Sequence, residues 1–267
     1  MDGAAKTILL TNDDGINAEG INKLKSVLLP KYNVYVVAPV DQMSATSHSL
    51  SLFKPLRARP IDEYNVAIYG SPADCVNFGL LHYLKDKHVD LVISGINDGP
   101  NMGDDLHYSG TFAGAAEAAL FNVDAISVSV NALLKCDFEP AAQYMLKIVE
   151  WLFSKRSIRE NNQNKGRGYW GTDAPALLNV NVPNLPMEFI KGIKWTSCGL
   201  RKYDDVIEER ADDKGGSEYW IIGNKLSGLL DDGTDMKAVN DGYVSISPIQ
   251  LDLTDYKILD YLKNEKI

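Results

Sequence analysis

The hydrophobic pattern at the start of the chain predicts short buried strands joined by an amphipathic helix. Thr7 to Thr11 is a run of apolar and β-branched residues, which is typical of a strand buried on both faces. Apolar residues then recur at helical spacing from Glu19 to Leu29, and Val34 to Ala38 forms a second apolar run. These three segments predict a β-α-β unit that begins a parallel sheet.

The same alternation continues through the first 158 residues. It predicts strands at Tyr64 to Tyr69, Asp90 to Ser94 and Ala125 to Val130, and helices at Pro72 to Leu84, Thr111 to Leu120 and Pro140 to Phe153. Strands that alternate with helices favour an α/β fold with a Rossmann-like, doubly wound, mostly parallel sheet. We therefore assign residues 1–158 to a Rossmann-like core.

The pattern changes after this core. Residues 159–175 are polar and glycine-rich, which indicates an exposed loop. Strand-like segments then alternate with turns rather than helices, and Tyr203 to Ile222 is typical of a long hairpin with a polar tip. We expect residues 176–267 to complete the core and to add an oligomerisation hairpin and a C-terminal arm.

This hairpin has too little helical cover to bury its own apolar residues. Tyr219, Trp220, Ile221 and Ile222 would remain partly exposed in a monomer, and exposed apolar patches mark interaction surfaces. The sequence therefore predicts a homodimer, or a homotetramer, held together by the C-terminal arms.

Composition narrows the classes of partner. A net charge of −9 argues against a nucleic-acid polymer, because binding to DNA or RNA depends on lysine and arginine. The three cysteines are far apart in sequence, so neither a disulfide framework nor a zinc site is indicated. No segment approaches the roughly 20 apolar residues of a membrane span, and we expect a cytoplasmic protein with no membrane partner.

Oxygen-bearing side chains follow three of the predicted strands. Asp13 and Asp14 follow the first, Ser44 the second, and Asn97 the strand that begins at Asp90. Because the carboxyl ends of parallel strands meet at one edge of a sheet, we expect these side chains to lie together. Mg²⁺ and Mn²⁺ prefer such oxygens, so the pattern predicts one divalent metal ion per subunit. Taken alone, Asp-Asp-Gly is also typical of a turn that caps a helix.

A second motif lies at the start of the predicted helix near residue 111. Ser109, Gly110 and Thr111 precede an alanine-rich run, and free backbone N–H groups at a helix N-terminus favour phosphate. The same residues are equally typical of an ordinary helix cap. The motif lacks the lysine of a Walker loop, so triphosphate binding of that type is not indicated.

Taken together, these motifs resemble the SurE (survival protein E) family of 5′/3′-nucleotidases. The matching segments are Ile8 to Gly15, Val37 to Pro39, Ser44 to Leu50, Gly70 to Val76, Asp90 to Thr111, Tyr219-Trp220, Gly233 to Asp235 and Gly242 to Ile246. The resemblance implies a metal-dependent phosphomonoesterase, a 5′-nucleotidase or acid-type phosphatase, acting on nucleoside 5′- and 3′-monophosphates and on short polyphosphate. It also implies that subunits exchange C-terminal segments.

The resemblance also implies roles for individual residues. The metal-ligand positions fall on Asp13, Asp14, Ser44 and Asn97, of which Asp13, Asp14 and Asn97 are also assigned to catalysis. The substrate-binding positions are Asn12, Asn101, Ser109, Gly110 and Thr111.

Several alternatives remain open at this stage. A water nucleophile is the preferred mechanism, and Asp13 as a covalent nucleophile is the alternative. His48 and His107 flank the expected site and are candidates for proton transfer. A non-catalytic nucleotide-binding or stress-related interaction module is a different class of function. A dinucleotide oxidoreductase is disfavoured because the first strand-helix turn lacks GxGxxG.

Overall fold

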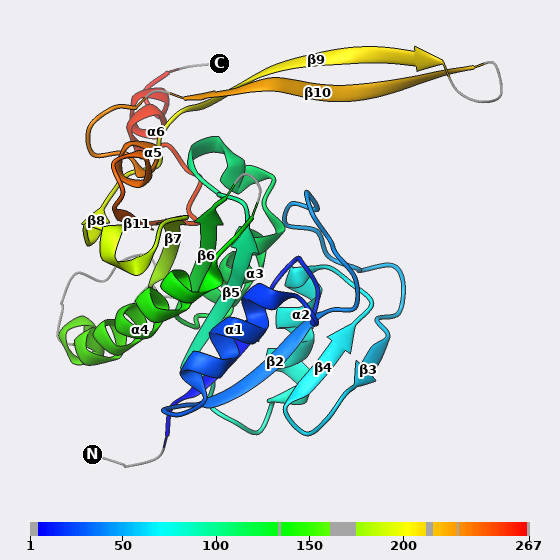
Figure 1. The fold of residues 1–267 in the computed structure, drawn as a ribbon, viewed down its shortest axis with the longest axis vertical. Helices are drawn as coiled ribbons and strands as arrows, with labels where there is room; N and C mark the ends of the chain where they lie inside the picture. Colours follow the sequence, from blue (N-terminus) through cyan, green and yellow to red (C-terminus); the bar gives the residue numbers. More distant parts are fainter. Residues whose placement is uncertain (1–4, 133–134, 161–174, 212–215, 229, 266–267) are drawn as a thin grey trace.

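The computed structural model describes residues 5–132, 135–160, 175–211, 216–228 and 230–265. Its central element is a nine-stranded sheet (Figure 1). Its strands, in spatial order, are β3 (Ala58–Pro60), β4 (Asn65–Ile68), β2 (Asn33–Pro39), β1 (Thr7–Thr11), β5 (Leu91–Asp98), β6 (Ala125–Asn131), β7 (Leu177–Pro183), β11 (Val244–Pro248) and β8 (Ile193–Trp195).

The centre of this sheet is parallel. Strands β4, β2, β1, β5, β6 and β7 run in the same direction, whereas β3 and β11 are antiparallel to their neighbours β4 and β7. The chain builds outwards from β1 on one side and from β5 on the other. The strand order therefore reverses between β1 and β5, which is where open α/β sheets bind ligands.

Helices cover both faces of the sheet. Side chains of α1 (Glu19–Leu28) and α4 (Phe138–Glu160) pack with Ile8 and Leu10 of β1, and those of α2 (Pro72–Phe78) and α3 (Gly110–Leu120) pack with Leu9. Successive residues of a strand point to opposite faces, so the apolar run at the N-terminus serves both layers. The doubly wound α/β prediction is confirmed.

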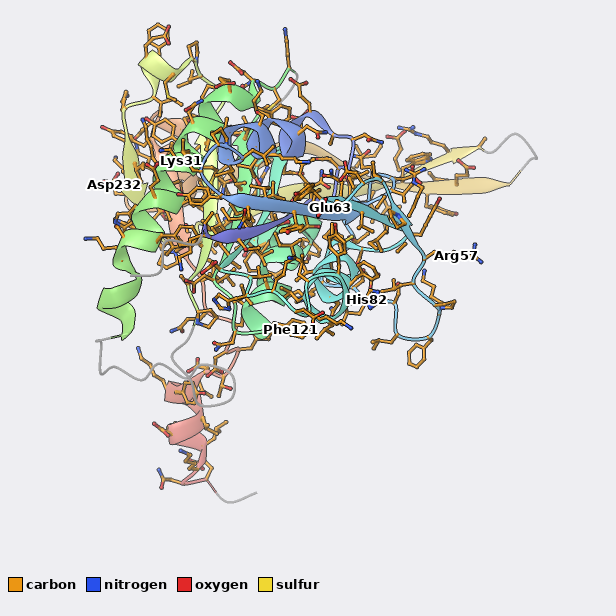
Figure 2. All side chains as sticks on the ribbon, turned by 90° about the horizontal axis from the view of Figure 1, so that it is seen from below. Lys31, Arg57, Glu63, His82, Phe121 and Asp232 are labelled. Carbon is orange, nitrogen blue, oxygen red and sulfur yellow. The ribbon has the colours of Figure 1, made fainter. Side chains whose placement is uncertain are left out.

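The second half of the chain contributes to the sheet and also extends away from it. Strands β9 (Arg201–Ala211) and β10 (Ser217–Gly228) form an antiparallel ribbon that projects from the sheet (Figure 1). Its Tyr219, Trp220 and Ile221 are exposed, as predicted. Helix α5 (Asp235–Asn240) precedes β11, and the last helix, α6 (Tyr256–Leu262), points away from the rest of the molecule (Figure 2).

Several predicted boundaries were wrong. The structure adds the exposed edge strand β3, ends α2 at Phe78 and continues it as a π-helical turn, η1 (Gly79–Tyr83). Helices α5 and α6 stand where only strands and turns were expected. Each is capped by a side chain, that of Thr234 for α5 and that of Asp255 for α6, which explains where each begins.

Residues on both sides of the predicted division near residue 158 contribute to one sheet. Helix α4 continues to Glu160, and strands β7, β8 and β11 from beyond the division extend the same sheet. Most of the predicted loop at 159–175 lies outside the described residues. Short 3₁₀ turns, η2 (Gly103–His107) and η4 (Met187–Phe189), complete the connections. In the described part of the chain, none of the helices combines the length and hydropathy that crossing a membrane would require.

Candidate active site

Asp13 occupies the centre of the site, directly after β1. Its side chain is buried, and its Oδ1 accepts a 2.5 Å hydrogen bond from the hydroxyl of Thr111 at the start of α3. Its backbone carbonyl accepts a 2.7 Å hydrogen bond from the N–H of Met43, in the loop that follows β2. The structure therefore brings together three of the segments in which the sequence predicted ligands.

Asp14 and the end of β5 form the other side of the site. Thr11 of β1 is paired in register with Ser94 of β5, which places the residues after both positions at the same edge of the sheet. A backbone hydrogen bond from Asp98 reaches the carboxylate of Asp14. The amide nitrogen of the neighbouring Asn97 donates to the carbonyl of Gly99 at 2.7 Å, which fixes the orientation of that side chain.

The charged forms of the two adjacent carboxylates are unfavourable in the folded protein. Burial raises the pKa of Asp13, although the Thr111 hydroxyl partly offsets this effect. Burial, followed by the charges of Asp13 and Asp98, raises the pKa of Asp14 to about 6. Within the described residues, neither carboxylate is paired with a lysine, arginine or histidine. A bound cation would remove this repulsion.

The donors present at this edge of the sheet fit a hard divalent cation. Among the residues that the structure describes, no three His, Cys, Asp or Glu side chains form a metal-binding group, so any centre here combines two carboxylates with neutral oxygens. Such a mixture is typical of Mg²⁺ or Mn²⁺. Among the residues that the structure describes, none is a hydrogen-bond partner of the carbonyl oxygen of the buried Asn12 side chain. Ser44 is exposed and lies one residue after Met43, which contacts Asp13.

The predicted phosphate cradle lies against Asp13. The hydroxyl of Ser109 accepts a 3.0 Å hydrogen bond from the N–H of Phe112, so Ser109 does cap α3. A Cβ on Gly110 would lie 2.9 Å from Oδ2 of Asp13, which shows how closely the helix backbone approaches the carboxylate. Since the hydroxyl of Thr111 is directed at Asp13, this residue links the predicted metal ligands to the predicted phosphate cradle.

The two remaining predicted substrate-binding residues have structural partners. The amide nitrogen of Asn12 donates to the carbonyl of Gly15 at 2.8 Å and so shapes the turn after β1. Asn101 is buried, and its side-chain nitrogen donates to Ser129 at 2.9 Å. Direct contact of either residue with a substrate stays a prediction.

Sequence reasoning missed the polar groups that support the site. Asn179 and Asn181 on β7 both donate to the carbonyl of Asn101, at 2.9 Å and 2.8 Å. The alternation of asparagine with valine in β7 could have identified them, because it places both amides on one face of a buried strand. Glu117, which pairs with His48, was also missed. His107, the other candidate for proton transfer, is exposed at the end of η2.

Comparison with known proteins gives consistent matches over nearly the whole chain. The family described as Survival protein SurE matches residues 8–205. A 5′-nucleotidase SurE of Petrotoga mobilis is 41% identical over 261 residues, covering 96% of this chain and 98% of the relative. A 5′-nucleotidase SurE of Geotalea daltonii is also 41% identical, covering 97% of this chain and 99% of the relative. The crystal structure of the SurE protein from Aquifex aeolicus superimposes with a TM-score of 0.81 at 39% identity, covering 96% of this chain and 98% of that one.

Proposed function

Since this chain belongs to the Survival protein SurE family, we propose that it is a nucleotidase, a hydrolase that releases phosphate from nucleoside 5′-monophosphates. The observation that carries this proposal is the pair of the buried Asp13, set against the N-terminus of α3, and the partly buried Asp14, with no cationic partner for either among the described residues. A non-catalytic nucleotide-binding or interaction module is not favoured. Nucleoside 3′-monophosphates and short polyphosphate are further substrates that we propose.

The proposed cofactor is one Mg²⁺ or Mn²⁺ ion per subunit, held by Asp13, Asp14, Ser44 and Asn97. A divalent cation in this position polarises the phosphoryl group and makes water more acidic, which favours a water nucleophile. The amide nitrogen of Asn97 is occupied by the Gly99 carbonyl, so its oxygen is the end available to a ligand.

The protein's own groups orient the reactants. Thr111 holds the Asp13 carboxylate by a hydrogen bond, and the N-terminus of α3 favours the phosphate. Gly110 allows the helix backbone and the carboxylate to approach one another closely. Together these contacts keep the anionic substrate beside two negatively charged side chains, an arrangement that requires the cation.

Phosphate release from AMP, GMP and a generic phosphomonoester tests the proposal. We expect release only when Mg²⁺ or Mn²⁺ is present, and we expect a chelator to abolish it reversibly. Release that a chelator does not change would contradict the metal requirement. A protein that binds nucleotides and hydrolyses none of them would support the non-catalytic alternative, whereas a trapped phosphoenzyme would favour Asp13 as the nucleophile.

Metal affinity should fall as the pH is lowered through 6. The metal binds the deprotonated carboxylate, and the pKa of Asp14 in the folded protein is raised to about 6, so a proton competes with the metal below that pH. Linkage to one proton predicts that the Mn²⁺ dissociation constant is about tenfold higher at pH 5 than at pH 7. Calorimetric titration at constant ionic strength measures this ratio. In Asp14→Asn the dissociation constants at the two pH values should be closer to one another. Equal affinities at the two pH values would contradict the assignment of Asp14.

Assembly through the C-terminal arms is the second prediction from this proposal. We expect a homodimer or homotetramer, because the β9–β10 ribbon exposes apolar residues and α6 buries none of its own. Light scattering on the full chain and on a chain ending at Pro248 should show loss of the assembly on truncation. A monomeric full-length protein, or a truncated chain that retains the complete assembly, would show that the arms are not the interface. The cytoplasmic location expected from the sequence stays a prediction.

A further inference from the structure

A buried carboxylate on α3, that of Glu117, takes no part in the mechanism above. Glu117 of α3 is 5% exposed, and its Oε2 lies 2.5 Å from Nε2 of His48. Its other oxygen, Oε1, accepts a 2.6 Å hydrogen bond from the side-chain amide of Asn77 on α2. This Asn77–Glu117–His48 cluster joins two helices to the loop that carries Ser44.

The loop around Ser44 has an unfavourable backbone conformation. Ala45 and Ser47 have φ values of 55° and 50°, in the left-handed region that residues other than glycine rarely adopt. Such conformations persist only where surrounding contacts hold them. Because Ser44 directly precedes Ala45, its orientation depends on those contacts.

Contacts hold the loop on both sides of Ser44. On the N-terminal side, the N–H of Met43 donates to the carbonyl of Asp13 at 2.7 Å. On the C-terminal side, the N–H of Ser47 donates to the carbonyl of Tyr108 at 3.2 Å, and His48 then pairs with Glu117. A histidine bonded to a buried carboxylate is a directional contact, so the exposed His48 is the first side-chain anchor after the strained turn, ahead of the hydrogen bonds from Ser51 to Asp74.

His48 pairs with a residue well inside α3. Glu117 lies six residues beyond Thr111, which is roughly 9 Å along a helix that rises 1.5 Å per residue. Thr111 is the residue of α3 that contacts Asp13. The cluster therefore meets the site at the loop that carries Ser44, and this is the route through which we expect it to act.

We propose that the Asn77–Glu117–His48 cluster is a positioning device that holds Ser44 as a ligand of the divalent metal ion. This inference rests on the proposed function, because it requires a metal at Asp13 and Asp14. The cluster fixes the strained turn, so the Ser44 hydroxyl is already oriented when the ion binds. Without the anchor, metal binding must also order the loop, and affinity falls.

His48→Ala tests this role in the full chain. Calorimetric titration of the metal-free protein with Mn²⁺ should give a dissociation constant at least about tenfold higher than that of the wild type, since groups that orient metal ligands have effects of this size. Amide hydrogen exchange in a peptide covering residues 43–51 should become faster. His48→Gln retains an N–H donor towards Glu117 and should recover most of the affinity and protection.

His88→Ala is the matched control. His88 also lies beside a carboxylate, with its Nε2 3.6 Å from Oδ1 of Asp90, but at the opposite edge of the sheet, and this variant should behave as the wild type. Wild-type Mn²⁺ affinity and exchange in His48→Ala would overturn the inference and leave the proposed function intact. A wild-type protein that binds no Mn²⁺ and releases no phosphate would overturn both.

Discussion

Asp13→Asn should reduce metal-dependent phosphate release by at least about a thousandfold, because a bound metal contributes several kcal/mol to catalysis and each 1.36 kcal/mol changes the rate tenfold. Asparagine keeps the shape of the side chain and can still accept the hydrogen bond from Thr111. The substitution removes one of the two charges that we propose to hold the cation. It should therefore impair metal binding without disturbing the fold.

The same substitution should not destabilise the metal-free protein. Burial raises the pKa of Asp13, so its charged form is unfavourable in the folded state, and a neutral amide removes that penalty. Thermal unfolding should show an unchanged or higher midpoint without metal, together with a smaller increase on adding Mn²⁺. Asp41→Asn is the control, since Asp41 is an exposed carboxylate after β2 and carries the same charge. Near-wild-type turnover in Asp13→Asn would remove Asp13 from the site.

Gly110→Ala should lower kcat by about a hundredfold, since a displacement of about 1 Å in a catalytic group has an effect of that size. The new Cβ would lie 2.9 Å from Oδ2 and 3.0 Å from Cβ of Asp13, and 3.1 Å from the hydroxyl of Thr46. Asp13 cannot move aside freely, because Thr111 holds its side chain and Met43 holds its backbone.

Helix stability does not account for this expected loss. Alanine is a better helix former than glycine, so α3 itself should not be weakened by the substitution. Steady-state kinetics with AMP, combined with thermal unfolding, separates misplacement of the carboxylate from unfolding. Wild-type kcat in a correctly folded Gly110→Ala variant would show that the close approach to Asp13 has no role in turnover.

The sequence predicted those parts of the fold in which local pattern and burial agree. Ile8, Leu9 and Leu10 form a continuous apolar run because both faces of β1 are covered, and this run identified the strand correctly. The end of β5 was placed too early, at Ser94, because Gly95 and the Asn97-Asp98 pair are typical of a turn. In the structure, Asn97 still pairs with Ser129 of β6. Tertiary pairing here overrides local preference.

The sequence predicted individual residues of the candidate site but not the contacts between them. Motifs identified Asp13 and Thr111 separately, but the hydrogen bond between them joins residues 98 positions apart, and no local pattern reports such a contact. Glu117 could have been singled out from the sequence, because it is the only acidic residue between Asp105 and Asp124 and lies in an alanine-rich segment. A lone buried carboxylate needs a partner, but the sequence does not say that the partner is His48.

The order of the elements along the chain also determines when the site can assemble during synthesis. β1 leaves the ribosome first, but Asp13 gains its contact with Thr111 only 98 residues later. At about 5–20 residues per second, this delay lasts roughly 5 to 20 s, and for most of it the apolar β1 lacks its neighbour β5. The ribbon β9–β10 and helix α6 emerge later still. The residues that place Asp13 against Thr111 are therefore synthesised before the segments through which we expect subunits to join.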